Sequence, residues 1–154
     1  MSTLEIGSQL PAFTAQTNHG EINSQELVGT PFVLYFYPRD STPGCTNEAR
    51  DFQANLPAFE KLGVKIIGVS RDSIKSHERF AERQELTFAL ISDPEETVCN
   101  LFSVIKDKNM YGRKVRGIER STFLFNAKGE LVQQWRKVRV PGHVEAVLEA
   151  AQAL

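Results

Sequence analysis

Cysteine is scarce in this sequence, and the two residues present, Cys45 and Cys99, lie far apart. Two distant cysteines form neither the disulfide framework of a small secreted domain nor a Cys-x-x-Cys pair. The three histidines, His19, His77 and His143, are equally scattered, so they suggest no cluster of metal ligands. The sequence therefore predicts a protein with no metal and no cofactor.

Long apolar runs and an excess of charge of one sign are also missing. No run approaches the length of a membrane span, and residues 1–5 lack the basic and apolar regions of a signal peptide. The formal net charge of −1 gives no electrostatic reason to expect nucleic acid or an anionic membrane as a partner. We therefore expect a cytoplasmic protein that binds neither.

The composition is that of an ordinary globular domain, with 154 residues of which 41% are hydrophobic and 24% charged. This is enough chain to bury one core, so we expect a single domain over residues 1–154. Strand and helix patterns alternate, which predicts parallel βαβ units, and a last hairpin and helix add antiparallel edges. We expect a hairpin around 17–20, strands at 32–37, 64–69, 88–91, 121–125 and 130–135, and helices at 43–62 (with a kink at Pro57), 73–84, 94–104 and 143–153.

Cys45 stands where a buried strand should end and a helix begin. Pro38 stops the apolar run 32–37, and Thr42 followed by Pro43 has the form of a helix N-cap and first helical residue. Cys45 then falls in the first turn, at the place that Glu or Gln takes in a capping box. Free backbone N–H groups and the helix dipole favour an anion there, so the sequence predicts a nucleophilic thiolate.

The spacing Pro38-x-x-x-Thr42-x-x-Cys45 resembles the active-site signature of the peroxiredoxins. Residues 37–48, 110–112 and 117–124 resemble the bacterioferritin comigratory protein (PrxQ) subgroup, so the likeness covers nearly the whole chain. It implies an α/β thioredoxin-like fold, a mixed central sheet flanked by helices, with an N-terminal β-hairpin extension. It also implies a thiol-dependent peroxidase of antioxidant defence that is a monomer or a weak dimer.

Arg120 is the second residue of the expected site. In the predicted topology the strand that begins at Ser121 runs antiparallel to the strand that ends at Tyr37, so Arg120 and Cys45 should converge. A guanidinium there would hold the sulfur as thiolate and stabilise the peroxide oxygens, the role that the resemblance implies. The alternative is a surface arginine paired with Glu119 or another carboxylate.

Three further residues have a structural and a functional interpretation. Thr42 caps the helix or, as the resemblance implies, hydrogen-bonds to sulfur and peroxide. Pro38 ends the strand or, by the same resemblance, also shields the thiolate from water. Glu48 lies one turn after Cys45, where it could be a solvated first-turn carboxylate, reduce the positive potential at the thiol, or, as the resemblance implies, orient Arg120.

The expected reaction is attack of the Cys45 thiolate on a peroxide, which leaves a sulfenic acid. Resolving cysteines of the subgroup lie five residues later, here Arg50, or on the helix 73–84, and this chain has none at either place. We therefore favour a one-cysteine enzyme reduced by thioredoxin, glutaredoxin or glutathione. The alternative is Cys99 as resolving cysteine after local unfolding, although its apolar neighbours suggest a buried thiol.

Two other functions, and the role of one basic segment, are not decided by the sequence. A redox sensor or binding module would use the same activated Cys45, whereas a thioredoxin-type disulfide reductase would need a second cysteine three residues after Cys45, where Glu48 stands. The basic segment 106–116 is predicted to be a solvated, mobile loop. It could instead dock an acidic reductant or steer an anionic hydroperoxide.

Overall fold

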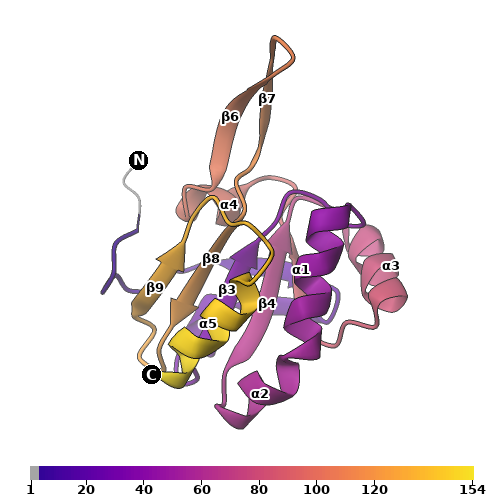
Figure 1. The fold of residues 1–154 in the computed structure, drawn as a ribbon. Helices are drawn as coiled ribbons and strands as arrows, with labels where there is room; N and C mark the ends of the chain where they lie inside the picture. Colours follow the sequence, from indigo (N-terminus) through magenta and orange to yellow (C-terminus); the bar gives the residue numbers. More distant parts are fainter. Residues whose placement is uncertain (1–3) are drawn as a thin grey trace.

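The computed structural model describes residues 4–154 (Figure 1). The first three residues, which bear on the expected lack of a signal peptide, and the side chains of Lys108 and Met110 lie outside this description. Seven strands form one mixed sheet in the order β2-β1-β5-β4-β3-β8-β9. Their bounds are Thr14–Thr17 (β1), Gly20–Asn23 (β2), Phe32–Phe36 (β3), Lys65–Ser70 (β4), Ala89–Ser92 (β5), Ser121–Phe125 (β8) and Leu131–Trp135 (β9).

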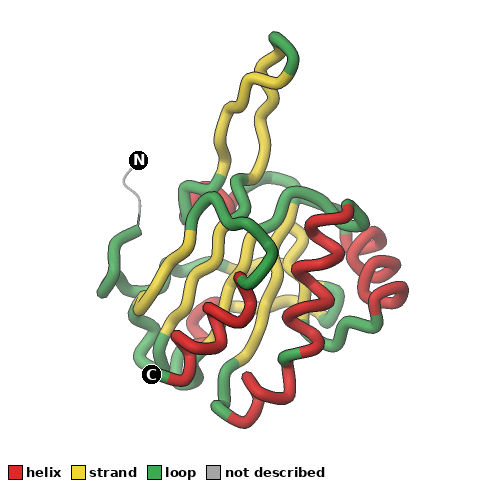
Figure 2. The backbone as a smooth tube through the Cα atoms, in the orientation of Figure 1, coloured by secondary structure: helices red, strands yellow, loops and turns green. Residues whose placement is uncertain are grey.

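Helices cover both faces of this sheet, and loops join them at its two ends (Figure 2). The helices are η1 (Ser24–Leu27), α1 (Pro43–Ala54), α2 (Leu56–Lys61), α3 (Ile74–Gln84), α4 (Thr97–Leu101) and α5 (His143–Gln152). The expected N-terminal hairpin is β1–β2, which joins the sheet because β1 pairs antiparallel with β5. None of the helices formed by residues 4–154 has the length and apolarity that crossing a bilayer requires.

The register of the central strands positions the site. β3 pairs parallel with β4 and antiparallel with β8, and Phe36 lies opposite Ser121. The residue before β8 therefore lies beside the residue after β3, as the sequence predicts for Arg120.

Strand residues alternate between two buried cores, one on each face of the sheet. Val33, Tyr35 and Leu124 belong to the core that contains Cys45. The intervening residues, such as Leu34, belong to the core that contains Cys99. The sheet therefore lies between the two cysteines.

Two predicted helices differ from the structure. The helix expected at 43–62 is not kinked but divided at Asn55, because Pro57 has no N–H and stands in the first turn of α2. The helix expected at 94–104 covers only Thr97–Leu101, because Glu96 and Ser103 have positive φ angles of 64° and 54°. Left-handed residues on both sides limit α4 to little more than one turn.

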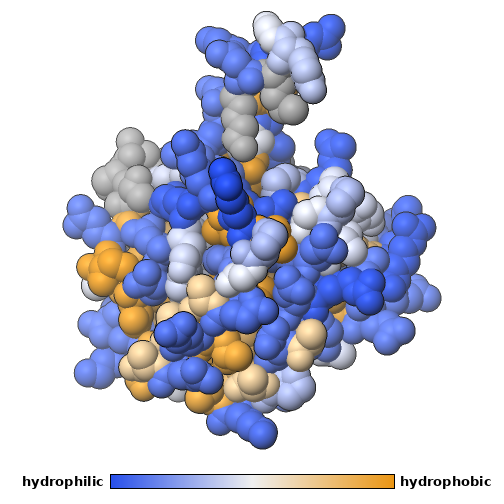
Figure 3. All heavy atoms as spheres, in the orientation of Figure 1, coloured by the Kyte–Doolittle hydropathy of each residue, from blue (hydrophilic) through white to orange (hydrophobic). Residues whose placement is uncertain are grey.

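The segment expected to be a loop is a two-stranded ribbon, so that prediction is wrong. β6 (Ile105–Met110) and β7 (Arg113–Ile118) pair antiparallel and project from the body of the molecule (Figure 1). Tyr111 and Gly112 join them with positive φ angles of 53° and 79°, which are typical of a type I′ hairpin turn. On the face shown in Figure 3, hydrophilic side chains dominate the ribbon, and small hydrophobic patches lie near β9 and α5.

Candidate active site

Cys45 is the third residue of α1 and is 1% exposed. Thr42 holds the N-cap position with extended φ and ψ angles, as predicted, but its hydroxyl does not cap the helix. It donates instead to the carbonyl of Arg39, over 2.9 Å. The N–H groups of the first turn of α1 are therefore not satisfied by the threonine side chain.

Arg120 lies beside Cys45, as the predicted topology requires. Its Nη2 is 3.4 Å from Cys45 Sγ, and its Nη1 donates to Glu48 Oε1 over 2.7 Å. The guanidinium pairs with Glu48 rather than with Glu119, the expected alternative. Gly44 makes this close approach feasible, because a Cβ there would stand 3.1 Å from Arg120 Nη2.

Burial and charge oppose each other in this pair. Burial raises the pKa of Glu48 to about 7, although the charge and hydrogen bond of Arg120 lower it. Burial lowers the pKa of Arg120, but Glu48 and Cys45 outweigh this effect and hold it above its usual value. The guanidinium thus keeps its positive charge next to the sulfur.

His143, the first residue of α5, is a member of the site that the sequence analysis does not identify. Its Nε2 is 2.8 Å from Thr122 Oγ1 and 4.0 Å from Glu48 Oε2. Burial, with a smaller contribution from the charge of Arg120, lowers the pKa of His143 to about 4, so the ring is neutral at neutral pH. Nothing in the sequence marks this histidine, since it lies 23 residues after Arg120 and outside any motif.

Tyr35 belongs to the same buried core as Cys45. Burial raises the pKa of its phenol, and the charges of Glu48 and Cys45 raise it further, so the hydroxyl keeps its proton. Neither this hydroxyl nor Glu48 Oε2 has a hydrogen-bond partner among the described residues.

A cavity of about 950 Å³ opens in front of Arg120, between the base of the β6–β7 ribbon and the loop before α5. Pro38 and Arg120 both line it, so a small molecule in the cavity can reach the guanidinium. The whole lining consists of Pro38, Lys106, Asp107, Asn109, Ile118, Glu119, Arg120, Lys137 and Val138.

Cys99 lies outside this arrangement. It is fully buried on α4, on the other face of the sheet, and its N–H donates to Asp93 Oδ2 over 2.8 Å. Burial raises its pKa strongly, and Asp93 adds to the effect. Of the site residues expected from the sequence, the structure brings Arg120 and Glu48 into contact with each other and Arg120 to Cys45. Pro38 lines the cavity with Arg120, Thr42 holds the N-cap of α1, and Cys99 is left out.

Comparison with known proteins gives the same family over most of the chain. Residues 6–134 match the AhpC/TSA family. Peroxiredoxin Bcp of Xanthomonas campestris is 60% identical over 121 residues, 79% of this chain and 76% of the relative. A putative peroxiredoxin Bcp of Coxiella burnetii is 44% identical over 95% of this chain and 97% of its own.

Solved structures of the same group share the fold. Peroxiredoxin Q of Xanthomonas campestris superposes with a TM-score of 0.88 at 53% identity, covering 92% of this chain and 90% of its own. BcpB of Mycobacterium tuberculosis superposes with a TM-score of 0.85 at 26% identity, covering 98% of both chains. The expected thioredoxin-like fold is confirmed. The chain belongs to the AhpC/TSA family, within its Bcp/peroxiredoxin Q group, and is a peroxiredoxin, an enzyme that reduces peroxides at the expense of thiols.

Proposed function

We propose that this enzyme reduces hydrogen peroxide and organic hydroperoxides in a one-cysteine cycle through a sulfenic acid on Cys45. One observation carries the proposal. Arg120 connects Glu48 to the sulfur of Cys45 beside an open cavity, whereas Cys99 is buried on the opposite side of the sheet.

The first step is attack of the Cys45 thiolate on the outer oxygen of the peroxide. An S–O bond forms, the O–O bond breaks, and the alkoxide or hydroxide that leaves takes a proton to become an alcohol or water. Arg120 stabilises the charge that develops on the two oxygens, and Glu48 holds the guanidinium in place. Thr42 turns its hydroxyl from the Arg39 carbonyl to the peroxide, and Pro38 limits the access of water.

The second step needs a thiol from outside the chain. That thiol attacks the sulfenic sulfur and releases water, and another thiol then cleaves the mixed disulfide and regenerates Cys45. Cys99 would have to cross the sheet to take this role, because a disulfide requires Cα atoms within about 7 Å. We therefore propose thioredoxin, glutaredoxin or glutathione as the reductant.

The size of the cavity supports the proposal that both hydrogen peroxide and larger organic hydroperoxides are substrates. At about 950 Å³ it has room for an alkyl hydroperoxide, and Lys106 and Lys137 add positive charge near Arg120. A solved structure of the Xanthomonas campestris bacterioferritin comigratory protein, 50% identical with a TM-score of 0.90 over 97% of this chain and 98% of its own, is described in terms of alkyl peroxide reduction. We extend that substrate class to this chain.

Turnover of two variants tests the mechanism. Peroxide consumption is measured for the wild type, Cys45→Ser and Cys99→Ser, with a thioredoxin system and separately with glutathione plus glutaredoxin. We expect Cys45→Ser to be inactive and Cys99→Ser to match the wild type, and the system that supports turnover identifies the reductant.

Other outcomes of this assay separate the alternatives. Loss of activity in both variants would assign Cys99 as the resolving cysteine, and a Cys45–Cys99 peptide in the mass spectrum would agree with it. An inactive wild type that forms a mixed disulfide with one partner protein would indicate a redox sensor.

We also propose that the protein is cytoplasmic and a monomer or a weak dimer. The exposed large apolar side chains of residues 4–154 do not form one long stretch, and only two of them, Tyr111 and Val115, share the β6–β7 ribbon. This favours a small assembly over a ring. The six side chains are those of Ile6, Val28, Leu62, Tyr111, Val115 and Leu154. Light scattering across a concentration series tests the assembly, and cell fractionation tests the location.

A further inference from the structure

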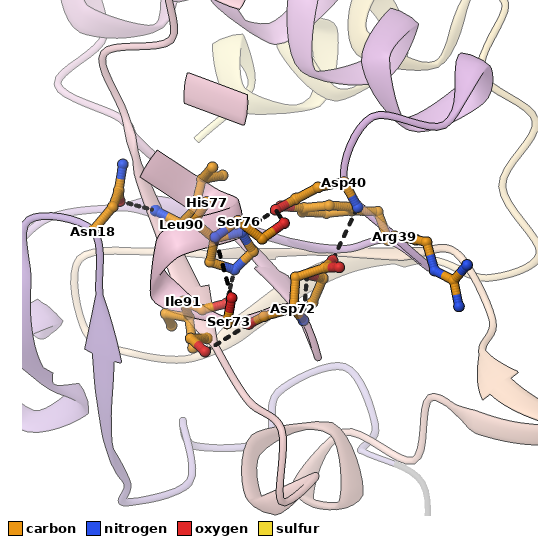
Figure 4. A network of polar contacts seen from close by, with 12 residues as sticks. Asn18, Arg39, Asp40, Asp72, Ser73, Ser76, His77, Leu90 and Ile91 are labelled. Carbon is orange, nitrogen blue, oxygen red and sulfur yellow. Dashed lines mark hydrogen bonds and ion pairs between the residues drawn. The ribbon is translucent and has the colours of Figure 1, made fainter. Parts of the chain in front are cut away.

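A buried polar cluster joins the segment before Cys45 to helix α3 (Figure 4). Asp40, in the turn between β3 and α1, points at His77 of α3, and their side chains are 2% and 0% exposed. The hydroxyl of Tyr37 donates to Asp40 Oδ1 over 2.7 Å, and the hydroxyl of Ser76 donates to Asp40 Oδ2 over 2.8 Å. One carboxylate thus collects the polar groups of two elements.

The hydrogen bonds of His77 fix how many protons the pair holds. Its Nε2 lies 2.9 Å from the carbonyl oxygen of Ile91, which can only accept, so Nε2 carries a hydrogen. Its Nδ1 lies 2.7 Å from Asp40 Oδ2, so a hydrogen must lie between these two atoms as well. A neutral ring with its hydrogen on Nε2 and an ionised carboxylate would have no hydrogen between them. The pair therefore holds two hydrogens, one on Nε2 and one between Nδ1 and Asp40 Oδ2.

The main chain of Asp40 is held too. Its N–H donates to Asp72 Oδ2 over 2.9 Å, and Ser70 Oγ donates to the same oxygen. Ligand atoms of Asp40, Asp72 and His77 all lie within 4.8 Å of one another, a spacing that could hold a metal ion. Both nitrogens of His77 are engaged in hydrogen bonds, however, so we interpret this cluster as a proton-holding one.

The residue after Asp40 has a strained backbone. Ser41 has a φ of 65°, a left-handed conformation that is costly for a residue with a side chain. The next residue is Thr42, and Gly44 then passes so close to Arg120 that a Cβ would lie 3.1 Å from its Nη2. A small displacement of this segment therefore changes the distance between Cys45 and Arg120.

We propose that Asp40 and His77 form a clasp that holds the strained turn before Cys45, and that both are positioning residues for peroxide reduction. The clasp favours the arrangement in which Cys45 faces Arg120. It also opposes the second half of the cycle, because a sulfenic acid on a 1% exposed residue must become accessible to a reducing thiol. Weakening the clasp should slow oxidation of Cys45 and speed its reduction.

The kinetic test measures the two half-reactions separately. Samples are quenched with a thiol-blocking reagent, and mass spectrometry of the Cys45 peptide gives the fraction oxidised at each time. Asp40→Ala is expected to slow oxidation by peroxide about 100-fold, the cost of a misplaced reacting group, and to speed reduction of the sulfenic acid by glutathione. Asp40→Asn is the conservative variant, because its amide can donate to the Nδ1 of a neutral ring. It should restore oxidation to within about threefold of the wild type, since a well-paired amide replaces the lost hydrogen bond at little net cost.

A gentler variant keeps the test decisive if Asp40→Ala does not fold. Tyr37→Phe removes only the hydroxyl that donates to Asp40, and we expect oxidation to slow roughly threefold to tenfold, as for one lost hydrogen bond. Tyr111→Phe, at a fully exposed tyrosine of the ribbon, is the matched control and should leave both rates unchanged. Slowing of both half-reactions alike in Tyr37→Phe, or of neither, would overturn the proposal.

Nitrogen NMR of His77 tests the proton count directly. We expect Nε2 to carry hydrogen in both the wild type and Asp40→Asn, and Nδ1 to share a hydrogen with a carboxylate only in the wild type. A wild-type Nδ1 that shares no hydrogen with Asp40 would refute the clasp as described. This measurement does not rest on the proposed thiol cycle, so a failure of the cycle, seen as an inactive wild type, remains distinct from a failure of the clasp.

Discussion

Cys45 and Cys99 occupy equivalent places in two helices. Cys45 is the third residue of α1, and Cys99 is the third residue of α4. Both are almost fully buried, at 1% and 0% exposed. Helix position and burial, the two features most often used to judge a cysteine, therefore do not distinguish them.

The groups at the two helix N-termini do distinguish them. In α4 the carboxylate of Asp93 accepts hydrogen bonds from the N–H groups of Val98 and Cys99, so a negative charge already fills the place that a thiolate would take. In α1 the hydroxyl of Thr42 bonds elsewhere, and the guanidinium of Arg120 stands beside the sulfur. The first-turn N–H groups beside Cys99 are thus taken by a carboxylate, whereas the Thr42 side chain before Cys45 leaves those of α1 open to an anion.

The largest expected effect comes from removing the cation beside Cys45. Arg120→Gln keeps a donor but loses the charge, so the rate of oxidation of Cys45 by peroxide should fall roughly 100-fold to 1000-fold. Stopped-flow oxidation kinetics measure this rate, with Arg113→Gln on the exposed ribbon as control. A rate within threefold of the wild type would show that the helix terminus alone activates Cys45.

The next effect concerns the carboxylate that holds Arg120. The pKa of Glu48 is raised from its usual 4.5 to about 7, mainly by burial. The folded protein therefore binds a proton that the unfolded chain releases near pH 4.5, and the free energy of unfolding falls as the pH rises from about 4.5 to about 7. Glu48→Gln should remove most of this decline, which amounts to about 3 kcal/mol.

Urea denaturation at both ends of that pH range measures the difference. Glu60→Gln, at an exposed carboxylate of α2, serves as control and should show the decline of the wild type. An unchanged pH dependence in Glu48→Gln would mean that Arg120 compensates the burial of Glu48 completely.

The smallest effect comes from removing the carboxylate beside Cys99, a group that none of the described residues provides at the start of the helix of Cys45. Asp93→Asn removes the negative charge at the N-terminus of α4, so the pKa of Cys99 should fall, although burial still holds it above its usual value. Asparagine keeps only one of the two acceptor oxygens of Asp93, so the lost hydrogen bond should cost about 1 kcal/mol of stability. The ultraviolet absorbance of the thiolate, titrated in a Cys45→Ser background, reports the change. Peroxidase activity of Asp93→Asn alone should equal that of the wild type.

Much of the site could be predicted because its signals are local. The strand, proline and N-cap pattern from Phe32 to Pro43 placed Cys45 in the first turn of a helix. The antiparallel arrangement of two strands then brought Arg120 beside it. Helical spacing placed Glu48 on the same face as Cys45, three residues later, and the family resemblance then favoured its pairing with Arg120 over a solvated carboxylate.

The ribbon β6–β7 was missed because its sequence lacks the usual signals of a hairpin. Its turn is Tyr111-Gly112 instead of Asn-Gly or Asp-Gly, and the side chains described from Arg113 to Arg116 are exposed on both faces, so no apolar alternation arises. The contacts of Asp40 with His77 and of Glu48 with His143 were missed for another reason. They join residues 37 and 95 positions apart, and only the folded sheet brings these together.

The chain has a single tryptophan, and it lies beside the active site. The ring of Trp135 meets that of His143 edge to face, with centroids 5.8 Å apart, and His143 in turn faces Glu48 and the guanidinium that touches the sulfur. The indole is therefore a built-in optical probe. Its fluorescence is expected to change when Cys45 passes from thiolate to sulfenic acid, so each turnover can be followed in the unlabelled enzyme.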